Sequence, residues 1–186
     1  MSGVGEVIRR TFIIRDLYLF TSPAIAGSGN VFDVFLQDDS FSQMADSYRL
    51  YRPLGLKLTM RTGVGFGATQ TTVFHAIGWV PNGTTVPTSM LDLSEPYFGA
   101  GSGSAFHDSV AHVVIPGKAM VGVSPWLATQ GDASDTFNDQ CGVIVWLRNG
   151  ISATQSYWFE AEFECEFRGR LDAGNISAEV LLQRIS

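Results

Sequence analysis

WFEAEFECEFR, residues 158–168, alternates apolar and charged side chains almost without fault. A period of two over this length predicts a β-strand with one buried face and one face in solvent. The solvent face carries four glutamates, which would repel one another unless basic side chains stood beside them. We name these the glutamate row: Glu160, Glu162, Glu164 and Glu166. The stretch therefore predicts two flanking strands that present arginine or lysine to this row.

The composition is that of a globular chain with many short strands. Of 186 residues, 45% are hydrophobic and only 16% are charged, against a usual level of about 25% charged. Glycine is frequent at 20 residues, as in chains with many turns. The net charge of −6 argues against a nucleic-acid-binding domain as a whole, although Arg9, Arg10 and Arg15 cluster near the start. Because no apolar run approaches 20 residues, no membrane partner is expected.

Seven further segments have strand patterns and are bounded by proline, glycine and Asn-Gly turn signals. Residues 27–30, Gly-Ser-Gly-Asn, are expected to be a break, and Pro53 is expected to stop the segment before the third strand. Residues 84–105 are expected to be a long connection of the kind often found at interfaces. With the opening stretch the strands number eight, lettered B to I in chain order: residues 7–20, 31–37, 54–62, 71–80, 107–115, 119–127, 141–148 and 158–168.

One short helix is predicted after strand C, within residues 38–48. Asp39 or Ser40 can serve as its N-cap. Apolar side chains then recur at intervals of three and four, which is typical of a helix with one buried stripe. These are Phe41, Met44, Ala45 and Tyr48.

The strands fit an all-β fold, an eight-stranded antiparallel jelly-roll sandwich. In that topology strands B, I, D and G form one sheet, and C, H, E and F form the other. Strand I then lies between B and D, so the glutamate row would face basic residues on both sides. These are Arg9 and Arg15 of strand B, and Lys57 and Arg61 of strand D. A register slip of one residue would expose the apolar face, so the pairing is strongly specified.

No repeat or linker composition divides the chain. We predict a single domain over residues 1–186, with short extensions at residues 1–6 and 171–186. Cys141 and Cys165 fall on different predicted strands and are expected to be buried free thiols.

Three passages resemble the shell domain of small icosahedral virus capsid proteins. They are FSQMADSYRLYRPLGLKLTMRT (residues 41–62), HAIGWVPNGTTVPTSMLDLSEP (75–96) and YWFEAEFECEFRGRL (157–171). The likeness is to tombusvirus-like positive-strand RNA viruses and to jelly-roll capsids of some circular single-stranded DNA viruses. It implies a capsid protein without enzymatic activity that self-assembles into an icosahedral shell. It also implies a single-stranded RNA or DNA genome as partner, and a virion assembled inside the host cell.

The resemblance suggests two kinds of ligand site. Arg9, Arg10 and Arg15 are the candidate nucleic-acid contacts, although pairing with the glutamate row explains Arg9 and Arg15 equally well. In these capsids calcium often bridges subunits through loop carboxylates. The candidate calcium ligands here, in the loop between strands G and H, are Asp132, Asp135 and Asp139; the alternative is a solubilising polar loop. No other cofactor is expected.

Aromatic side chains expected at the surface could anchor contacts between copies. They are Trp79, Tyr97, Phe98 and Trp126. The alternative function is a jelly-roll carbohydrate-binding, lectin-like module with aromatic loops. No catalytic residue is predicted, because the three histidines form no His-x-His cluster and the sequence has no Gly-x-Ser-x-Gly elbow.

Overall fold

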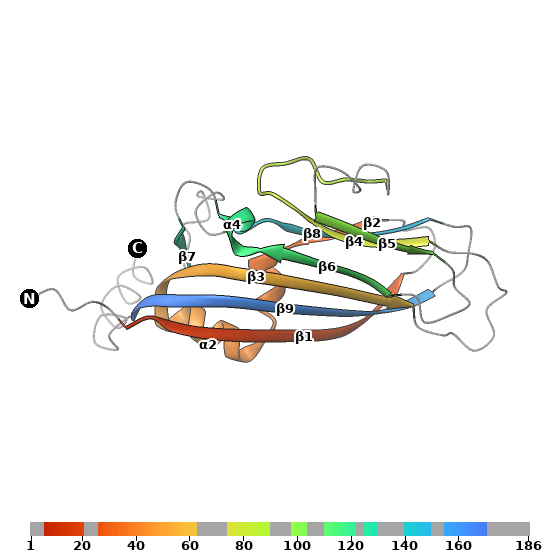
Figure 1. Ribbon diagram of the computed structural model, residues 1–186. Helices are drawn as coiled ribbons and strands as arrows, with labels where there is room; N and C mark the ends of the chain where they lie inside the picture. The colour runs from red at the N-terminus through yellow and green to blue at the C-terminus, as the bar shows by residue number, and fades with distance from the viewer. Residues whose placement is uncertain are drawn as a thin grey trace, which may run out of the picture.

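Two antiparallel sheets pack face to face in the computed structural model (Figure 1). It describes residues 6–20, 26–62, 74–89, 98–103, 110–121, 125–129, 140–149 and 155–170. The strands of this part are β1 (Ile8–Phe20), β2 (Ala26–Asn30), β3 (Tyr48–Thr62), β4 (Phe74–Val80), β5 (Phe98–Gly103), β6 (Val110–Pro116), β7 (Leu127–Ala128), β8 (Val143–Asn149) and β9 (Gln155–Arg170). The helices are α1 (Val31–Phe35), α2 (Asp39–Ser47) and α4 (Gly117–Met120).

The order of the strands is that of a jelly roll. One sheet runs β1–β9–β3–β6, with the short β7 paired to β3, and the other runs β2–β8–β4–β5. Strands B, I, D and G are thus β1, β9, β3 and β6, and strands C, H, E and F are β2, β8, β4 and β5. The predicted jelly-roll topology and the central position of strand I between B and D are confirmed, although strands C, F and G are formed by other segments than predicted.

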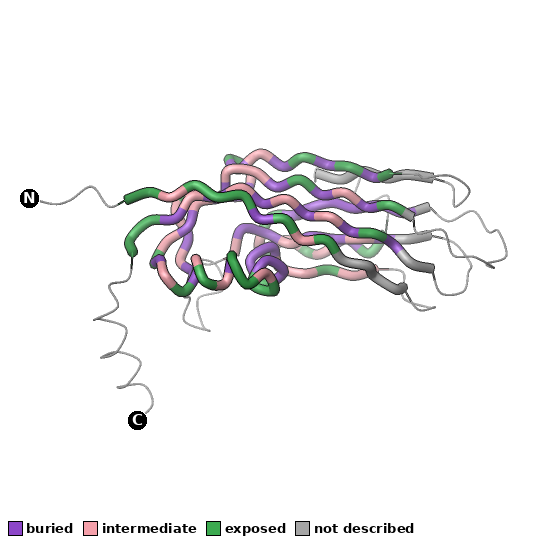
Figure 2. The backbone as a smooth tube through the Cα atoms, turned by 90° about the horizontal axis from the view of Figure 1, so that it is seen from below, coloured by how far each residue is buried: buried purple, intermediate pink, exposed green. Residues whose placement is uncertain are grey.

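The core lies between the two sheets and is rich in aromatic rings. Along β9 every inward side chain from Phe159 to Phe167 is buried, which gives the alternation visible in Figure 2. Phe41 of α2 is fully buried and its ring meets those of Phe12, Phe163 and Phe167 at centroid distances of 5.0, 6.0 and 5.9 Å. Edge-to-face and tilted contacts of this kind add to the burial of apolar area. The predicted helix is confirmed, but its predicted N-cap at Asp39 or Ser40 is wrong: the N-cap is Asp38, whose side chain accepts from the backbone N–H of Phe41 at 2.9 Å.

The predicted strand at residues 31–37 is wrong, because this segment begins with the helix α1. Its apolar side chains at 31, 32, 34 and 35 fit a helical stripe as well as a strand, and all four are buried. Strand C is instead β2, the Gly- and Ser-rich segment that was expected to be a break. Gly27 of β2 is required by Trp146 of β8, since a Cβ added at Gly27 would lie 2.2 Å from the indole Nε1 atom.

Pro53 does not end a segment, because β3 continues through it from Tyr48 to Thr62. The pairing with β9 shifts between Pro53 and Gly55, which places a β-bulge at Leu54. A bulge is one of the few places where a proline, which lacks an N–H donor, fits inside a sheet.

Strands F and G were also misplaced. The predicted strand at 107–115 corresponds to β6, which pairs with β3 and is therefore strand G. Strand F is β5, whose sequence FGAGSG has no alternating pattern and lay within the expected long connection at residues 84–105. The predicted strand at 119–127 is wrong in its described part, because α4 covers residues 119 and 120 and the strand β7 begins only at Leu127.

Candidate functional site

Four ion pairs cross the outward face of the β1–β9–β3–β6 sheet. Each glutamate of the row has one basic partner, and the partners come alternately from β1 and β3. We name this arrangement the ion-pair ladder: Arg15–Glu160 (2.6 Å), Lys57–Glu162 (2.7 Å), Arg9–Glu164 (2.5 Å) and Arg52–Glu166. The hydrogen bond and the charge of Glu162 raise the pKa of Lys57. The predicted neutralisation of the glutamate row from both sides is confirmed.

The strand register explains why the partners alternate. Arg15 lies directly opposite Glu160, and Lys57 lies directly opposite Glu162. Arg9 lies opposite Glu166, but it reaches diagonally to Glu164 because Arg52 of β3 already binds Glu166. Diagonal neighbours on a sheet are within reach of long side chains.

The bulge at Leu54 makes this face possible. Arg52 and Lys57 are five residues apart, so in an unbroken strand they would point to opposite faces. The extra residue restores a common face, and both basic side chains meet the glutamate row. Tyr51 and Leu56 are also five residues apart, and the bulge likewise keeps both on the inner face, where both are fully buried.

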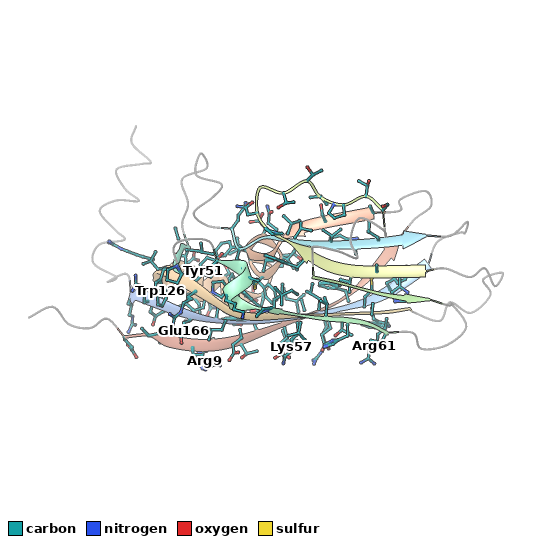
Figure 3. All side chains as sticks on the ribbon, turned by 45° about the horizontal axis from the view of Figure 1, so that its top comes forward. Arg9, Tyr51, Lys57, Arg61, Trp126 and Glu166 are labelled. Carbon is teal, nitrogen blue, oxygen red and sulfur yellow. The ribbon has the colours of Figure 1, made fainter. Side chains whose placement is uncertain are left out.

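Arg61 does not join the ladder as predicted. It lies opposite Trp158 instead of a glutamate, and within the described residues it forms no ion pair. Figure 3 places it at the far end of the sheet from Arg9 and Glu166. A hollow of about 340 Å³ opens here, lined by Arg15, Thr59, Arg61, Trp158, Phe159 and Glu160.

Trp158 is the other prominent residue beside this hollow. It is 53% exposed, the highest value among the large hydrophobic side chains whose exposure is described. Thr59, which also lines the hollow, has its hydroxyl 3.0 Å from Nδ1 of His112 on β6. Cationic, aromatic and polar side chains therefore meet at this end of the sheet.

The structure separates the three candidate nucleic-acid residues. Arg9 and Arg15 belong to the ion-pair ladder, as the alternative interpretation held. Arg10 lies opposite the buried Cys165, so it belongs to the other face of β1, where it is exposed at the sheet edge.

Two of the four predicted interface anchors, Trp79 and Trp126, have side chains that the structure describes. Trp79 is not at the surface: it is 2% exposed, and its Nε1 donates to the carbonyl of Cys141 at 3.0 Å. Trp126 is partly buried beneath the guanidinium groups of Arg52 and Arg168, which lie 4.9 and 4.2 Å from its ring centroid. Tyr97 lies outside the described residues, as does the side chain of Phe98.

The candidate calcium ligands Asp132, Asp135 and Asp139 also lie outside the described residues. Within the described part, histidine, cysteine, aspartate and glutamate form no group of three that could hold a metal ion. No helix found there is long and apolar enough to cross a membrane. Cys141 and Cys165 are buried free thiols as predicted, and burial raises the pKa of Cys141 to about 12.

Sequence reasoning missed Arg52 and Trp158. The sequence does not predict Arg52 as a partner of the glutamate row, because Pro53 indicates the end of a segment there, whereas the bulge lets β3 continue through it. The position of Trp158 on the solvent face could have been predicted, because Trp158 precedes Glu160 by two residues and so shares its face.

Comparison with known proteins gives a consistent result at the level of the fold. No protein-family model and no curated protein matches the sequence. Among solved structures, the chain is similar to one from mud crab tombus-like virus, with a TM-score of 0.70, 10% identity, and 94% of this chain and 87% of that chain covered. It is also similar to a chain of Desmodium yellow mottle tymovirus, with a TM-score of 0.62, 18% identity, and coverage of 92% and 86%.

A third similar structure is a decameric BFDV capsid protein, with a TM-score of 0.54, 14% identity, and coverage of 88% of this chain and all of that chain. The chain therefore has the jelly-roll fold of these viral proteins. At such identities the likeness shows the fold alone.

Proposed function

We propose that the chain is a viral capsid protein that self-assembles into an icosahedral shell around a single-stranded genome. The observation that supports this most is the extent of the structural likeness. The match covers about nine-tenths of this chain and most of each viral chain, so it concerns a whole subunit and not a shared motif. The order of the strands in both sheets is that of a jelly roll.

The work of such a subunit is association, not catalysis. Within a closed symmetric shell, many individually weak contacts between copies add up to a stable particle. The double sheet suits this role because its aromatic core and ion-pair ladder hold a fixed shape. Accordingly, we propose a structural protein of the virion without enzymatic activity.

Calcium is the one cofactor that we add to this proposal. Asp132, Asp135 and Asp139 would supply hard oxygen ligands between subunits. A chelator should then lower the temperature at which particles dissociate, and added Ca²⁺ should restore it. If the chelator does not change the dissociation temperature, the calcium proposal is wrong, whereas the proposal of a self-assembling shell is unaffected.

The lectin-like alternative predicts different behaviour in solution. A capsid subunit should form megadalton particles, detectable by light scattering of the purified full chain. A lectin-like module should remain a monomer or small oligomer and bind glycans on an array. The second result would overturn the proposal.

A further inference from the structure

The charge on the described surface is unevenly distributed. Among the described residues, the outward face of the β1–β9–β3–β6 sheet carries at least six basic side chains and the four carboxylates of the glutamate row. The six are Arg9, Arg15, Arg52, Lys57, Arg61 and Arg168. The rest of the chain is left with six basic and fourteen acidic residues. This face is thus net positive on a chain whose net charge is −6.

The ion-pair ladder determines where that positive charge is available. Four of the six basic groups are bound to carboxylates, so the middle of the face is close to neutral. Arg168 lies over the ring of Trp126. Among these six and within the described residues, Arg61 is the one whose guanidinium neither forms an ion pair nor lies over an aromatic ring.

Trp158 is the described tryptophan with the most open ring. Trp79 is buried, Trp146 packs against the core, and two guanidinium groups lie over Trp126. Trp158 and Arg61 are direct neighbours across β9 and β3, and the hollow lies beside both. An exposed indole next to a free guanidinium is the combination that binds single-stranded nucleic acid, through base stacking and phosphate contact.

We propose that Trp158 and Arg61 form a contact site for single-stranded nucleic acid on this face, which we name the stacking site. A base stacks on the indole of Trp158, and an adjacent phosphate binds the guanidinium of Arg61. Arg15, at the rim of the same hollow, adds positive potential while it remains bound to Glu160. The inference rests on the proposed function, because the genome is the occupant.

The surrounding surface favours nucleic acid over a second protein. Ile13, Val110 and Val114 are exposed apolar side chains on this face, but charged residues separate them. Arg61 stands between Trp158 and Val110, and Glu162 with Lys57 stands between Ile13 and Val114. They form no continuous apolar patch of the kind that marks a protein interface.

The test measures binding of fluorescein-labelled oligo(dT) and oligo(U) 12-mers to the full chain, kept as unassembled subunits, by anisotropy at several salt concentrations. Trp158→Ala should weaken binding roughly 5- to 150-fold, because one stacked base is lost. Arg61→Gln should weaken binding and reduce the salt slope by about 0.7, the value for one phosphate contact on a single strand. Lys118→Gln is the matched control: Lys118 is exposed on α4 and carries the same charge, so neither quantity should change.

A second pair of measurements separates stacking from general electrostatics. Trp158→Phe keeps a stacking ring, so affinity should stay within a few-fold of the unmodified chain while quenching of tryptophan fluorescence by the oligonucleotide is lost. Binding of inorganic polyphosphate, which has no bases, should respond to Arg61→Gln but not to Trp158→Ala. If Trp158→Ala leaves oligonucleotide affinity as unchanged as Lys118→Gln does, the stacking site is wrong.

The same variants distinguish this inference from the proposed function. All of the variants should form particles, because the side chains of Trp158 and Arg61 are exposed and are not part of the core. Particles of the Trp158→Ala variant should contain less nucleic acid, as measured by the ratio of their absorbance at 260 and 280 nm. Particles with unchanged nucleic-acid content would overturn the stacking site and leave the capsid proposal standing. Oligonucleotide binding that depends on Trp158, in a chain that never assembles, would support the stacking site and overturn the capsid proposal.

Discussion

His75 is the buried polar residue with the clearest consequence for stability. It is fully buried in β4, with its ring 5.5 Å from that of Tyr157. Neither ring nitrogen has a partner of good hydrogen-bond geometry among the described residues, and the backbone of Met60 beside the ring offsets only part of the effect of burial on its pKa. Burial lowers the pKa of His75 below its usual value of 6.5, because an imidazolium ion there would lose its hydration.

This pKa shift predicts a pH dependence with a definite sign. The unfolded chain takes up the proton near pH 6.5 and the folded chain takes it up only at lower pH. The stability is therefore fully present above pH 6.5 and falls as the pH drops below it, by at most about 1.4 kcal/mol per pH unit for one proton.

Urea unfolding of the subunit at pH 7.5 and pH 5 measures this loss. His75→Met has a similar volume and does not titrate, so it should reduce the difference between the two pH values. An equal difference in both proteins would mean that the acid sensitivity has another source.

Position 27 requires glycine, because the indole of Trp146 lies too close to its backbone to leave room for a Cβ atom. Its added Cβ would lie 2.2 Å from Nε1 of Trp146, so Gly27→Ala must displace the indole. We expect a loss of about 1–3 kcal/mol in the free energy of unfolding, as for other overpacked sites.

Gly55→Ala is the control for this substitution. Its Cβ would meet only the carbonyl of Ile115, at an ordinary distance of 3.8 Å. This variant should be neutral or slightly more stable, because the unfolded chain loses freedom. Equal effects of the two substitutions in urea unfolding would contradict the packing of Trp146 on β2.

At the scale of the element, the ion-pair ladder tests the register of β3 on β9. Arg52→Glu places a carboxylate beside Glu166 and should lower stability. Adding Glu166→Arg should recover part of the loss, with a coupling of about 0.5–1 kcal/mol, since the pair is partly exposed. Recovery should be incomplete, because the swap also removes the guanidinium of Arg52 from the ring of Trp126.

A double-mutant cycle by urea unfolding provides the measurement. Arg49→Glu is a suitable reference, because Arg49 is exposed on the same strand and has no ion pair in the described part of the chain. A coupling of zero between positions 52 and 166 would contradict the bulge that brings Arg52 to the glutamate row.

The elements that sequence predicted correctly are those with a long, clean period. Strands β1 and β9 alternate over more than ten residues, and α2 has a full apolar stripe with a polar cap. The strand predicted at residues 31–37 is wrong because the four apolar residues among the five of α1 fit the period of a helix as well as that of a strand. The strand β2 was missed because Gly27 is required by the indole of Trp146 on another strand, β8, and the strand β5 was missed because its sequence FGAGSG has no alternating pattern.

At the scale of the whole molecule, charge predicted the order of the strands. The glutamate row required basic neighbours on both sides, and only a central position for strand I supplies them. What the sequence could not supply was the identity of every partner. The bulge at Leu54 brings Arg52 to the outward face and so to Glu166, whereas the register of Lys57 on Glu162 places Arg61 opposite Trp158 and not opposite a glutamate.

The burial of Trp79 has the same kind of cause. The tryptophan lies beside a turn signal in the sequence, which suggests exposure, yet its ring packs against Gly142. A Cβ added at Gly142 would lie 2.2 Å from the indole, and the backbone there has a φ of 109° that also favours glycine. Only the assembled pair of β4 and β8 brings the two residues together.

Electron microscopy of the purified full chain tests the central claim most directly. We expect closed icosahedral particles whose reconstruction is fitted by one jelly roll per subunit, with the strand order β1–β9–β3–β6 and β2–β8–β4–β5. Monomers or small open oligomers, under conditions of pH, salt and Ca²⁺ that span those of assembly, would contradict it.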